Sequence, residues 1–341
     1  MTYCLPVVYP ICFQPPVKEI RIPVKWGHLA AKLWGSEHER PILALHGWQD
    51  NAGTWDPYAP MLCDKRPILA LDFPGHGFSS WIPEGMIHFL NYKIRDYFKW
   101  DKVSLLCHSM GSIAGMRFAS VFPDDIDFYI AVDSLIYDDY DLNRVVAHYS
   151  KMLRKLQALQ DLKGEPPCYT TEEIIKIWHL GTTKSVAKES VPYLLNRGAR
   201  ESSKEPNKYY FSRDPRLKHI LFSAEDKKLV ETMVKRIKCP TLYFKGIDSP
   251  YASDEHSVEM RETLAQNNSD FECHFIPSTH HLHLNNPELI EPIILHFLKK
   301  HSFLKHSLTN PQDNLEHCKR KLCLLSKSLV YNLVKVSKII I

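Results

Sequence analysis

The chain has 341 residues, of which 44% are hydrophobic and 24% are charged, and its formal net charge is +4. This is an ordinary globular composition with enough apolar material for a large core. The charge is small for this length, and no basic block is interleaved with aromatic residues. Composition therefore argues against a nucleic-acid-binding protein.

The cysteines and the apolar segments favour a cytoplasmic protein. The nine cysteines are scattered without a C-x-x-C pair or metal-ligand spacing, which is typical of reduced thiols. Residues 1–16 are apolar but lack a basic start and are broken by four prolines, so they resemble neither a signal peptide nor a membrane span. No other run reaches the roughly 18 apolar residues of a spanning helix. The last residues, 338–341, are not a peroxisomal address of the S-K-L type.

Apolar runs separated by helical patterns predict an α/β fold. Charge alternates with aliphatic residues over 18–25, and 28–34 follows as its hairpin partner. Continuous apolar runs are typical of parallel strands covered on both faces. Helical patterns lie between most of these runs, so the order is βαβα. There are six such runs, at residues 41–45, 67–71, 103–106, 126–132, 240–244 and 271–276.

Two gaps between the runs differ in length. Between Ser80 and Val103 there is room for one short helix, roughly 87–100. The gap between Val132 and Pro240 is much longer, charged and mainly helical in pattern. We interpret it as a cap inserted over the carboxyl edge of the sheet, since long structureless loops are uncommon in compact domains. The predicted domains are an N-terminal extension (1–17), an α/β core (18–135 and 237–303), a helical cap (136–236) and a tail (304–341).

A serine nucleophile is predicted at Ser109. The run Val103–Leu106 leads into Cys107-His108-Ser109-Met110-Gly111, and a small-residue helical segment follows. A strand, a serine in a tight turn and a helix describe the nucleophile elbow, in which the hydroxyl is lifted above the sheet edge. The usual pattern is G-x-S-x-G, and Cys107 replaces its first glycine.

A serine hydroxyl needs an imidazole to accept its proton, and the base of an elbow serine comes late in the chain. Three histidines follow the last apolar run, at 280, 281 and 283. His283 alternates with leucines, so we expect it to be a packed residue. His280 is the preferred base, and His281 is the second candidate.

The acid that orients the imidazole has three candidates. Asp248 lies just past the fifth apolar run and is preferred. Asp133 follows the fourth run and is the alternative, and Asp254 is the third candidate. Aspartates at strand ends also serve turns, so position alone does not choose among them.

Backbone N–H groups must face the negative charge that develops on the substrate oxygen. We expect one from Met110, the residue after the nucleophile, and one from Trp48, in the loop Leu45-His46-Gly47-Trp48 after an early strand. Glycine lets the backbone approach a substrate closely there. The Pro/Gly turn at 72–79 is interpreted as structural, because no Gly-Lys-Ser/Thr follows it.

Four features taken together resemble the α/β-hydrolase superfamily over about residues 18–300. They are His46-Gly47, the turn at 72–79, the elbow around Ser109 and the late His280. Similarity to serine hydrolase-like proteins of the kraken type is found in three segments, His46–Trp55, Lys99-Trp100 and Phe211–Leu217. The resemblance implies a serine hydrolase with a helical cap, and the distance back from Pro287 implies His280 as its base. It also implies a peroxisomal or vesicle-associated location as the alternative to the cytoplasm.

Residues beyond 304 resemble no family. From Asn314, apolar residues recur every three or four positions and lysines occupy the other face, which predicts a basic amphipathic helix. Such a helix can contact an acidic membrane surface, pack on the protein or extend from it.

The sequence thus predicts an α/β-hydrolase fold with a mostly parallel central sheet and a mainly helical inserted cap. The predicted activity is that of a carboxylic-ester hydrolase of class EC 3.1, acting on a small acyl or ester substrate through an acyl-enzyme on Ser109. No cofactor and no metal are expected. One alternative is a decayed, non-catalytic binding module, with Cys107 and the short segment after Ser80 as signs of decay. Another is serine chemistry on a thioester or C–C bond.

Overall fold

The structure is a computed structural model that describes residues 15–82, 90–139, 141, 143, 151–152, 154–159, 164–219 and 226–304. The chain divides into two compact units, residues 1–301 and 302–341, and the first contains nearly all described residues. Most of the predicted N-terminal extension and the predicted amphipathic helix lie outside the described residues. No helix in the described ranges is both long and apolar enough to cross a membrane.

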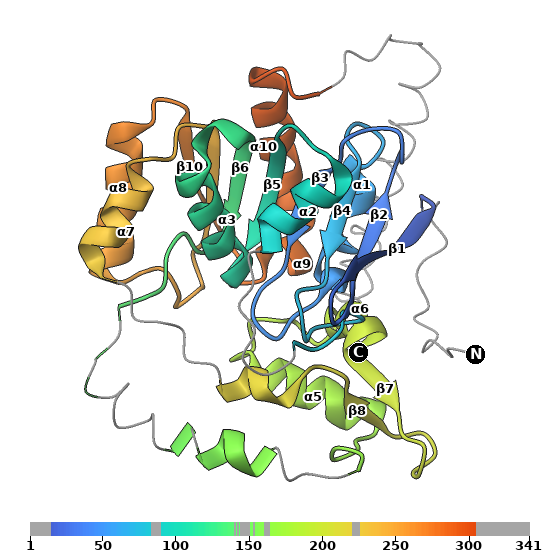
Figure 1. Cartoon of the computed structure of the whole chain (residues 1–341). Helices are drawn as coiled ribbons and strands as arrows, with labels where there is room; N and C mark the ends of the chain where they lie inside the picture. Colours follow the sequence, from blue (N-terminus) through green and yellow to red (C-terminus); the bar gives the residue numbers. More distant parts are fainter. Residues whose placement is uncertain are drawn as a thin grey trace, which may run out of the picture. The chain divides into compact units, whose positions relative to one another are not determined.

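An eight-stranded sheet forms the centre of the first unit (Figure 1), with the order β1-β2-β4-β3-β5-β6-β9-β10. The pairs β1·β2 and β2·β4 are antiparallel, and the other neighbours are parallel. Every predicted strand is present, so the α/β class and the mostly parallel sheet are confirmed. The strands are β1 (Val17–Val24), β2 (Gly27–Trp34), β3 (Ile42–Leu45), β4 (Ile68–Leu71), β5 (Val103–His108), β6 (Ile126–Val132), β9 (Thr241–Gly246) and β10 (Phe271–Ile276).

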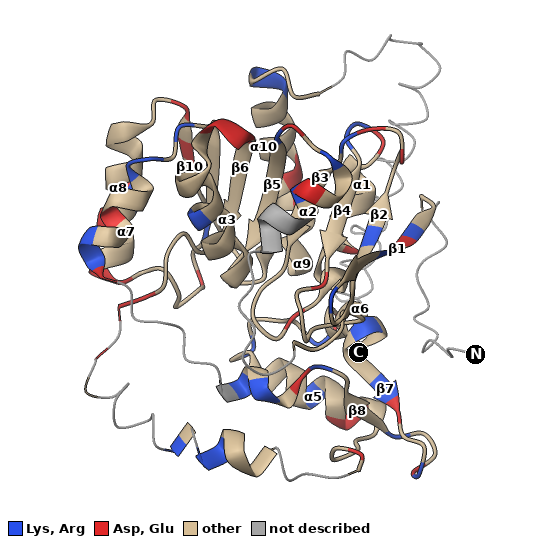
Figure 2. Cartoon of the chain, viewed as in Figure 1, with Lys and Arg blue, Asp and Glu red and all other residues tan. Residues whose placement is uncertain are grey.

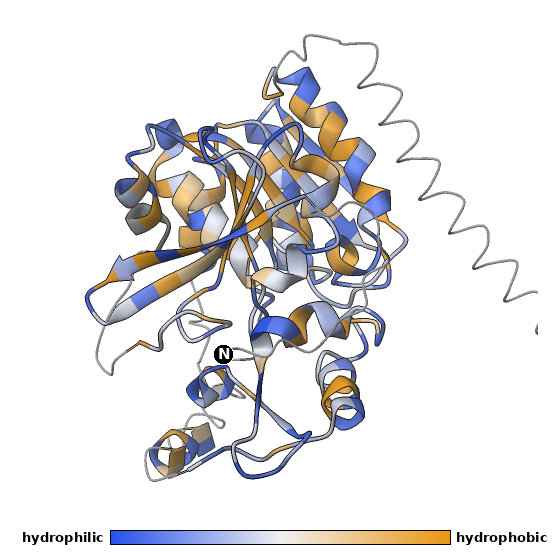
Figure 3. Ribbon diagram, turned by 90° about the vertical axis from the view of Figure 1, so that its right-hand side faces the viewer, coloured by the Kyte–Doolittle hydropathy of each residue, from blue (hydrophilic) through white to orange (hydrophobic). Residues whose placement is uncertain are grey.

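Helices cover both faces of the sheet, as the unbroken apolar runs require. Side chains alternate along each strand, so Leu105 and Cys107 of β5 join the core cluster that includes Met116 of α3 (Met110–Val121). The same cluster takes in α7 (Lys227–Val234) and α8 (Glu255–Asn267). On the opposite face Phe128 packs against Phe297 of α10 (Pro287–Lys300), with ring centroids 6.1 Å apart. Figure 3 shows the strands as mainly apolar ribbon inside these helices.

The shorter elements connect the strands at the sheet edges. The predicted short helix after Ser80 is present as α2 (Leu90–Phe98). The other elements of the core are η1 (Ala52–Trp55), α1 (Ala59–Leu62), η2 (Pro123–Asp125) and α9 (Leu282–Asn285).

Residues 164–219 form the longest described stretch of the predicted cap (136–236). They contain α5 (Thr171–Gly181), α6 (Val191–Gly198), η3 (Pro215–His219) and an antiparallel hairpin of β7 (Ala199–Glu201) and β8 (Tyr209–Phe211), which the sequence did not predict. Helix α7 lies in the same predicted stretch but packs against α3 and α8 beside the sheet.

A buried charge cluster attaches the cap to the core. Arg197 at the end of α6 donates from Nη2 to Oδ2 of Asp72 at 2.7 Å, and its guanidinium also pairs with Glu19 of β1. Asp72 is fully buried and also accepts the Ala52 N–H at 2.7 Å and the Phe78 N–H at 2.9 Å. The 72–79 turn therefore holds the cap in place, in agreement with its structural interpretation.

Candidate active site

Ser109 lies on the sharp turn between β5 and α3. Its backbone has φ 52° and ψ −119°, in the positive-φ region that non-glycine residues rarely adopt. Its N–H donates to the carbonyl of Val132, at the end of β6, at 3.1 Å. The strand, strained turn and helix predicted from the sequence are thus all present.

Two residues explain how the elbow packs without its first glycine. A Cβ at Gly111 would lie 2.6 Å from the carbonyl oxygen of Leu45, so the second glycine is required by close approach to β3. The Cys107 side chain is fully buried, and a Cβ at Gly115 would lie 3.0 Å from its sulfur. The glycine at 115 makes room for the thiol inside the core, and Cys107 does not crowd the turn.

His280 contacts Asp133. It follows β10, is 6% exposed, and its Nδ1 lies 2.6 Å from Oδ2 of Asp133. A carboxylate oxygen accepts, so Nδ1 carries the proton, and in the neutral ring Nε2 is left with a lone pair. Such a nitrogen can take the proton of a serine hydroxyl.

Asp133 is held in place by donors from β9. It directly follows β6, is fully buried, and its N–H donates to the carbonyl of Phe244 at 2.7 Å. Its Oδ1 accepts the Gly246 N–H at 2.6 Å and lies 3.3 Å from Nζ of Lys245, a buried cation that the sequence did not single out. These contacts fix the position of the Asp133 carboxyl group.

The preference for Asp248 over Asp133 is wrong as far as contact with His280 is concerned. Asp248 lies two residues past the end of β9, and its side chain is exposed. Asp254, the third candidate, caps α8 by accepting the Ser257 N–H. The carboxylate on His280 Nδ1 is that of Asp133, the alternative.

The other two candidate histidines are occupied elsewhere. His281 Nδ1 lies 2.6 Å from Oγ of Ser185 in the cap, and its Nε2 lies 3.8 Å from Oδ2 of Asp50. His283 is fully buried and its Nε2 lies 2.8 Å from Oγ1 of Thr54, in agreement with a packed role. Burial lowers the pKa of both imidazoles well below 6.5.

The loop after β3 approaches the serine closely. A Cβ at Gly47 would lie 3.2 Å from Cβ of Ser109. Nε2 of His46 accepts the Phe73 N–H at 2.9 Å, and its Nδ1 then donates to the carbonyl of Gly47 at 2.7 Å. Burial lowers the pKa of His46 to about 4, so the ring is neutral and fixes the loop. The indole N–H of Trp48 donates to the carbonyl of Leu217 in the cap at 3.0 Å.

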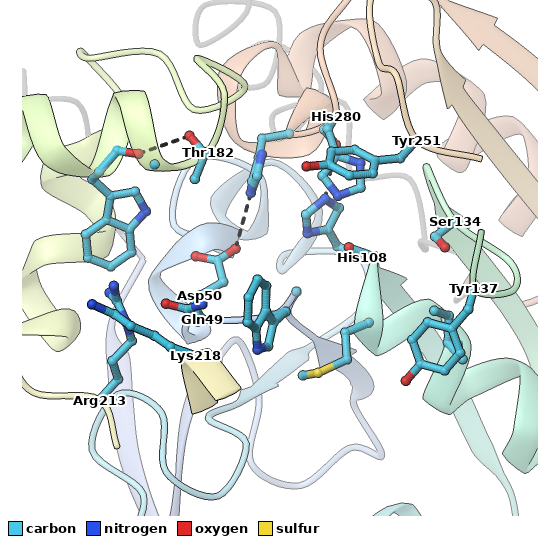
Figure 4. Close-up of a pocket in the computed structure, with 18 of the residues that line it drawn as sticks. Gln49, Asp50, His108, Ser134, Tyr137, Thr182, Arg213, Lys218, Tyr251 and His280 are labelled. Atoms are coloured by element: carbon cyan, nitrogen blue, oxygen red, sulfur yellow. Dashed lines mark hydrogen bonds and ion pairs between the residues drawn. The ribbon is translucent and has the colours of Figure 1, made fainter. Parts of the chain in front are cut away.

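These residues open into one cavity of about 540 Å³ between the sheet edge and the cap (Figure 4). Ser109, Met110, Trp48 and His280 all line it. Tyr251, which the sequence did not indicate, packs against the His280 ring with centroids 4.6 Å apart and the ring planes tilted by 50°. Apolar and aromatic residues from the core and the cap complete the wall, including Ile113, Ile136, Ile177, Trp178 and Phe211.

Among the described residues, one group has the donor atoms of a metal site. Ligand atoms of Asp50, His108 and His283 lie within 4.8 Å of one another. The rings of His108 and His283 are tilted by 42° relative to each other, with centroids 4.2 Å apart. No metal role is assigned to the group.

Comparison with known proteins agrees with this architecture. Residues 40–287 match the family model described as the alpha/beta hydrolase fold, and the chain belongs to that family. It is 34% identical to a probable serine hydrolase of Drosophila melanogaster, over 83% of this chain and 88% of that protein. It is 28% identical to a serine hydrolase-like protein of Danio rerio, over 83% and 89%. A crystal structure of a hypothetical protein from Pseudomonas aeruginosa PAO1 superposes with a TM-score of 0.69 at 27% identity, covering 81% of this chain and 99% of that one.

Proposed function

We propose that this protein is a serine hydrolase that cleaves an ester-like acyl bond of a small molecule. The observation that carries the proposal is the buried His280–Asp133 pair in the same cavity as a serine on a strained strand-to-helix turn. The similarity to probable serine hydrolases supports it.

In the proposed reaction, Ser109 Oγ attacks the acyl carbon while Nε2 of His280 takes its proton. Asp133 holds the ring in the required tautomer and stabilises the imidazolium. The amides of Met110, at the N-terminus of α3, and of Trp48 donate to the oxyanion. His280 then protonates the leaving alcohol, and water cleaves the acyl-enzyme by the same steps in reverse, which returns the proton to Ser109. No step requires a cofactor or a metal.

The test is labelling with a fluorophosphonate probe followed by peptide mapping. We expect an adduct on Ser109, and none on Ser112 or Ser134, two buried serines nearby whose hydroxyls donate to backbone carbonyls. Ser109→Ala should remove both the adduct and ester turnover while the circular dichroism spectrum stays unchanged.

Absence of an adduct in folded protein would favour the alternative, a non-catalytic binding module. Turnover that survives in Ser109→Ala would refute the mechanism.

A further inference from the structure

An unpaired cationic group lies inside the cavity, on its cap side. Arg213 follows β8 and is half-buried, Lys218 is on η3 and is exposed, and both line the cavity with Ser109 and His280. Figure 4 shows them at one end of the view, with His280 and Tyr251 at the other and Gln49 and Asp50 between. Figure 2 shows basic residues on η3, beside α5 in the cap.

The cap holds Arg213 in position through its aromatic residues. The guanidinium carbon lies 4.2 Å from the ring centroid of Phe211 and 5.4 Å from that of Trp178. Stacking on aromatic faces fixes the plane of a guanidinium while leaving its N–H groups available to a ligand. Its Nε is buried and has no hydrogen-bond partner.

Neighbouring arginines of the cap are neutralised, whereas Arg213 is not. Arg197 pairs with Asp72, and Arg216 pairs with Asp214 at 2.6 Å. Within the described ranges, no carboxylate oxygen lies within the 4.0 Å of an ion pair from either Arg213 or Lys218. An unpaired charge in a partly desolvated site is costly, and a bound anion would offset that cost.

Asp50 is the acidic group whose charge acts on Arg213, and it compensates only in part. Burial raises the pKa of Asp50 to about 7, so near neutral pH it is only partly ionised. Burial lowers the pKa of Arg213 to about 10, which still leaves it protonated. Burial and the Arg213 charge lower the pKa of Lys218. The cap side of the cavity thus has an excess of positive charge.

From this placement we infer that the cavity takes esters carrying a second, anionic group, and that Arg213 and Lys218 bind that group while the ester carbon lies at Ser109. This inference rests on the proposed hydrolase function. The anion is a carboxylate or a phosphate, because a guanidinium binds both through paired N–H donors. Apolar residues such as Ile177 and Met110 also line the cavity and suit a hydrocarbon chain between the two groups.

The experiment compares matched esters that differ in one charge. The kcat/KM for 4-nitrophenyl adipate is measured against that for 4-nitrophenyl hexanoate, with buffer hydrolysis subtracted. A second pair, 4-carboxyphenyl acetate and 4-methylphenyl acetate, places the anion on the alcohol side. Inorganic phosphate at rising concentration and constant ionic strength tests whether phosphate competes with the anionic ester.

We expect at least a tenfold preference for the anionic ester in one of the pairs, mainly through KM and falling with salt. Arg213→Gln should bring the ratio of the two kcat/KM values close to one, Lys218→Gln should reduce it, and Arg213→Lys should retain part of it. Lys176→Gln, at an exposed position of α5 that does not line the cavity, should leave the ratio unchanged.

The two proposals fail in different ways. If Ser109 is labelled and neutral esters are cleaved without any anionic preference, or if the preference survives in Arg213→Gln, the anion site is refuted and the hydrolase function stands. If Ser109 is not labelled and no ester of either pair is cleaved, the hydrolase function fails and the substrate class fails with it. When the preference for the anionic ester is present, competition by inorganic phosphate would show that the site also binds phosphate, and no competition would assign it to carboxylates.

Discussion

Asp50 is a buried carboxyl group whose removal should stabilise the protein at high pH. It is 4% exposed, and Nε2 of His281 lies 3.8 Å from its Oδ2. Burial raises its pKa from 3.8 to about 7, although hydrogen bonds from Thr54 and Asn51 act in the opposite direction. The native state therefore binds the proton more tightly than the unfolded state, so native stability falls as the pH rises through this range.

The size of the effect follows from the shift. A difference of about 3.2 pKa units at about 1.36 kcal/mol per unit gives a penalty of about 4 kcal/mol above pH 7. The penalty is absent below pH 3.8, where the group is protonated in both states. Asp50→Asn keeps the shape of the side chain but cannot ionise, so it removes the penalty.

The assay is urea unfolding of both proteins between pH 5 and pH 8.5. The free energy of unfolding of Asp50→Asn minus that of the original protein should increase by roughly 2–3 kcal/mol over this range. Asp248→Asn is the matched control, because its side chain is exposed, and its difference should stay within about 0.5 kcal/mol. A difference that does not change with pH, or a less stable Asp50→Asn at pH 8.5, would show that the native protein stabilises the charged carboxylate and would refute the reasoning.

Three further substitutions test the site and its support. Asp133→Asn should lower kcat on a 4-nitrophenyl ester by about 10⁴-fold, because the imidazole loses its orienting acceptor. Asp248→Asn should change kcat only a few-fold. A larger loss of kcat in Asp248→Asn than in Asp133→Asn would contradict the geometry. Arg197→Ala leaves the buried carboxylate of Asp72 without its cation, so the free energy of unfolding in urea should fall by about 3–5 kcal/mol. A loss below about 1 kcal/mol would show that other contacts hold the cap. Cys107→Gly should lower stability by about 1–2 kcal/mol without preventing fluorophosphonate labelling, and a folded but unlabelled variant would mean that the thiol is needed to shape the elbow.

The buried histidines around the elbow act as neutral structural groups. His46 and His76 each accept a backbone N–H with Nε2, from Phe73 and Gln49 respectively. The Nε2 of His108 lies 3.0 Å from the carbonyl oxygen of His280, so it donates there and fixes the backbone of the proposed base. Burial lowers the pKa of all three rings, and His280 is distinguished from them by its carboxylate partner.

The sequence by itself determined the strands, their order along the chain and the elbow at Ser109. Each of these is a local signal. Apolar runs of four to seven residues can be buried on both faces only in a covered sheet, and the backbone of a serine between such a run and a helix must turn sharply. The sequence of residues 103–108 therefore predicted the strand that the folded chain contains.

Tertiary structure decided which aspartate contacts His280, the cap hairpin and which charged residues line the cavity. Asp133 and Asp248 follow β6 and β9, which are neighbours in the sheet, so sequence position put both near His280. Asp133 directly follows a paired residue of β6 and has a positive φ of 53°. Gly246 and Lys245 hold its Oδ1, while its Oδ2 contacts the imidazole of His280. Asp248 lies beyond the last paired residue of β9 and faces solvent.

The same reason applies to the residues that line the cavity from the cap. Arg213 is one basic residue among many in the sequence, and its lack of a carboxylate partner depends on where Asp214 and Asp50 point in the folded chain. Local sequence sets the conformation of a segment because its hydrogen bonds and apolar periodicity lie within it. Which charges meet, and which stay unpaired, depends on side chains that are distant in the chain and come together only when the sheet and the cap close around them.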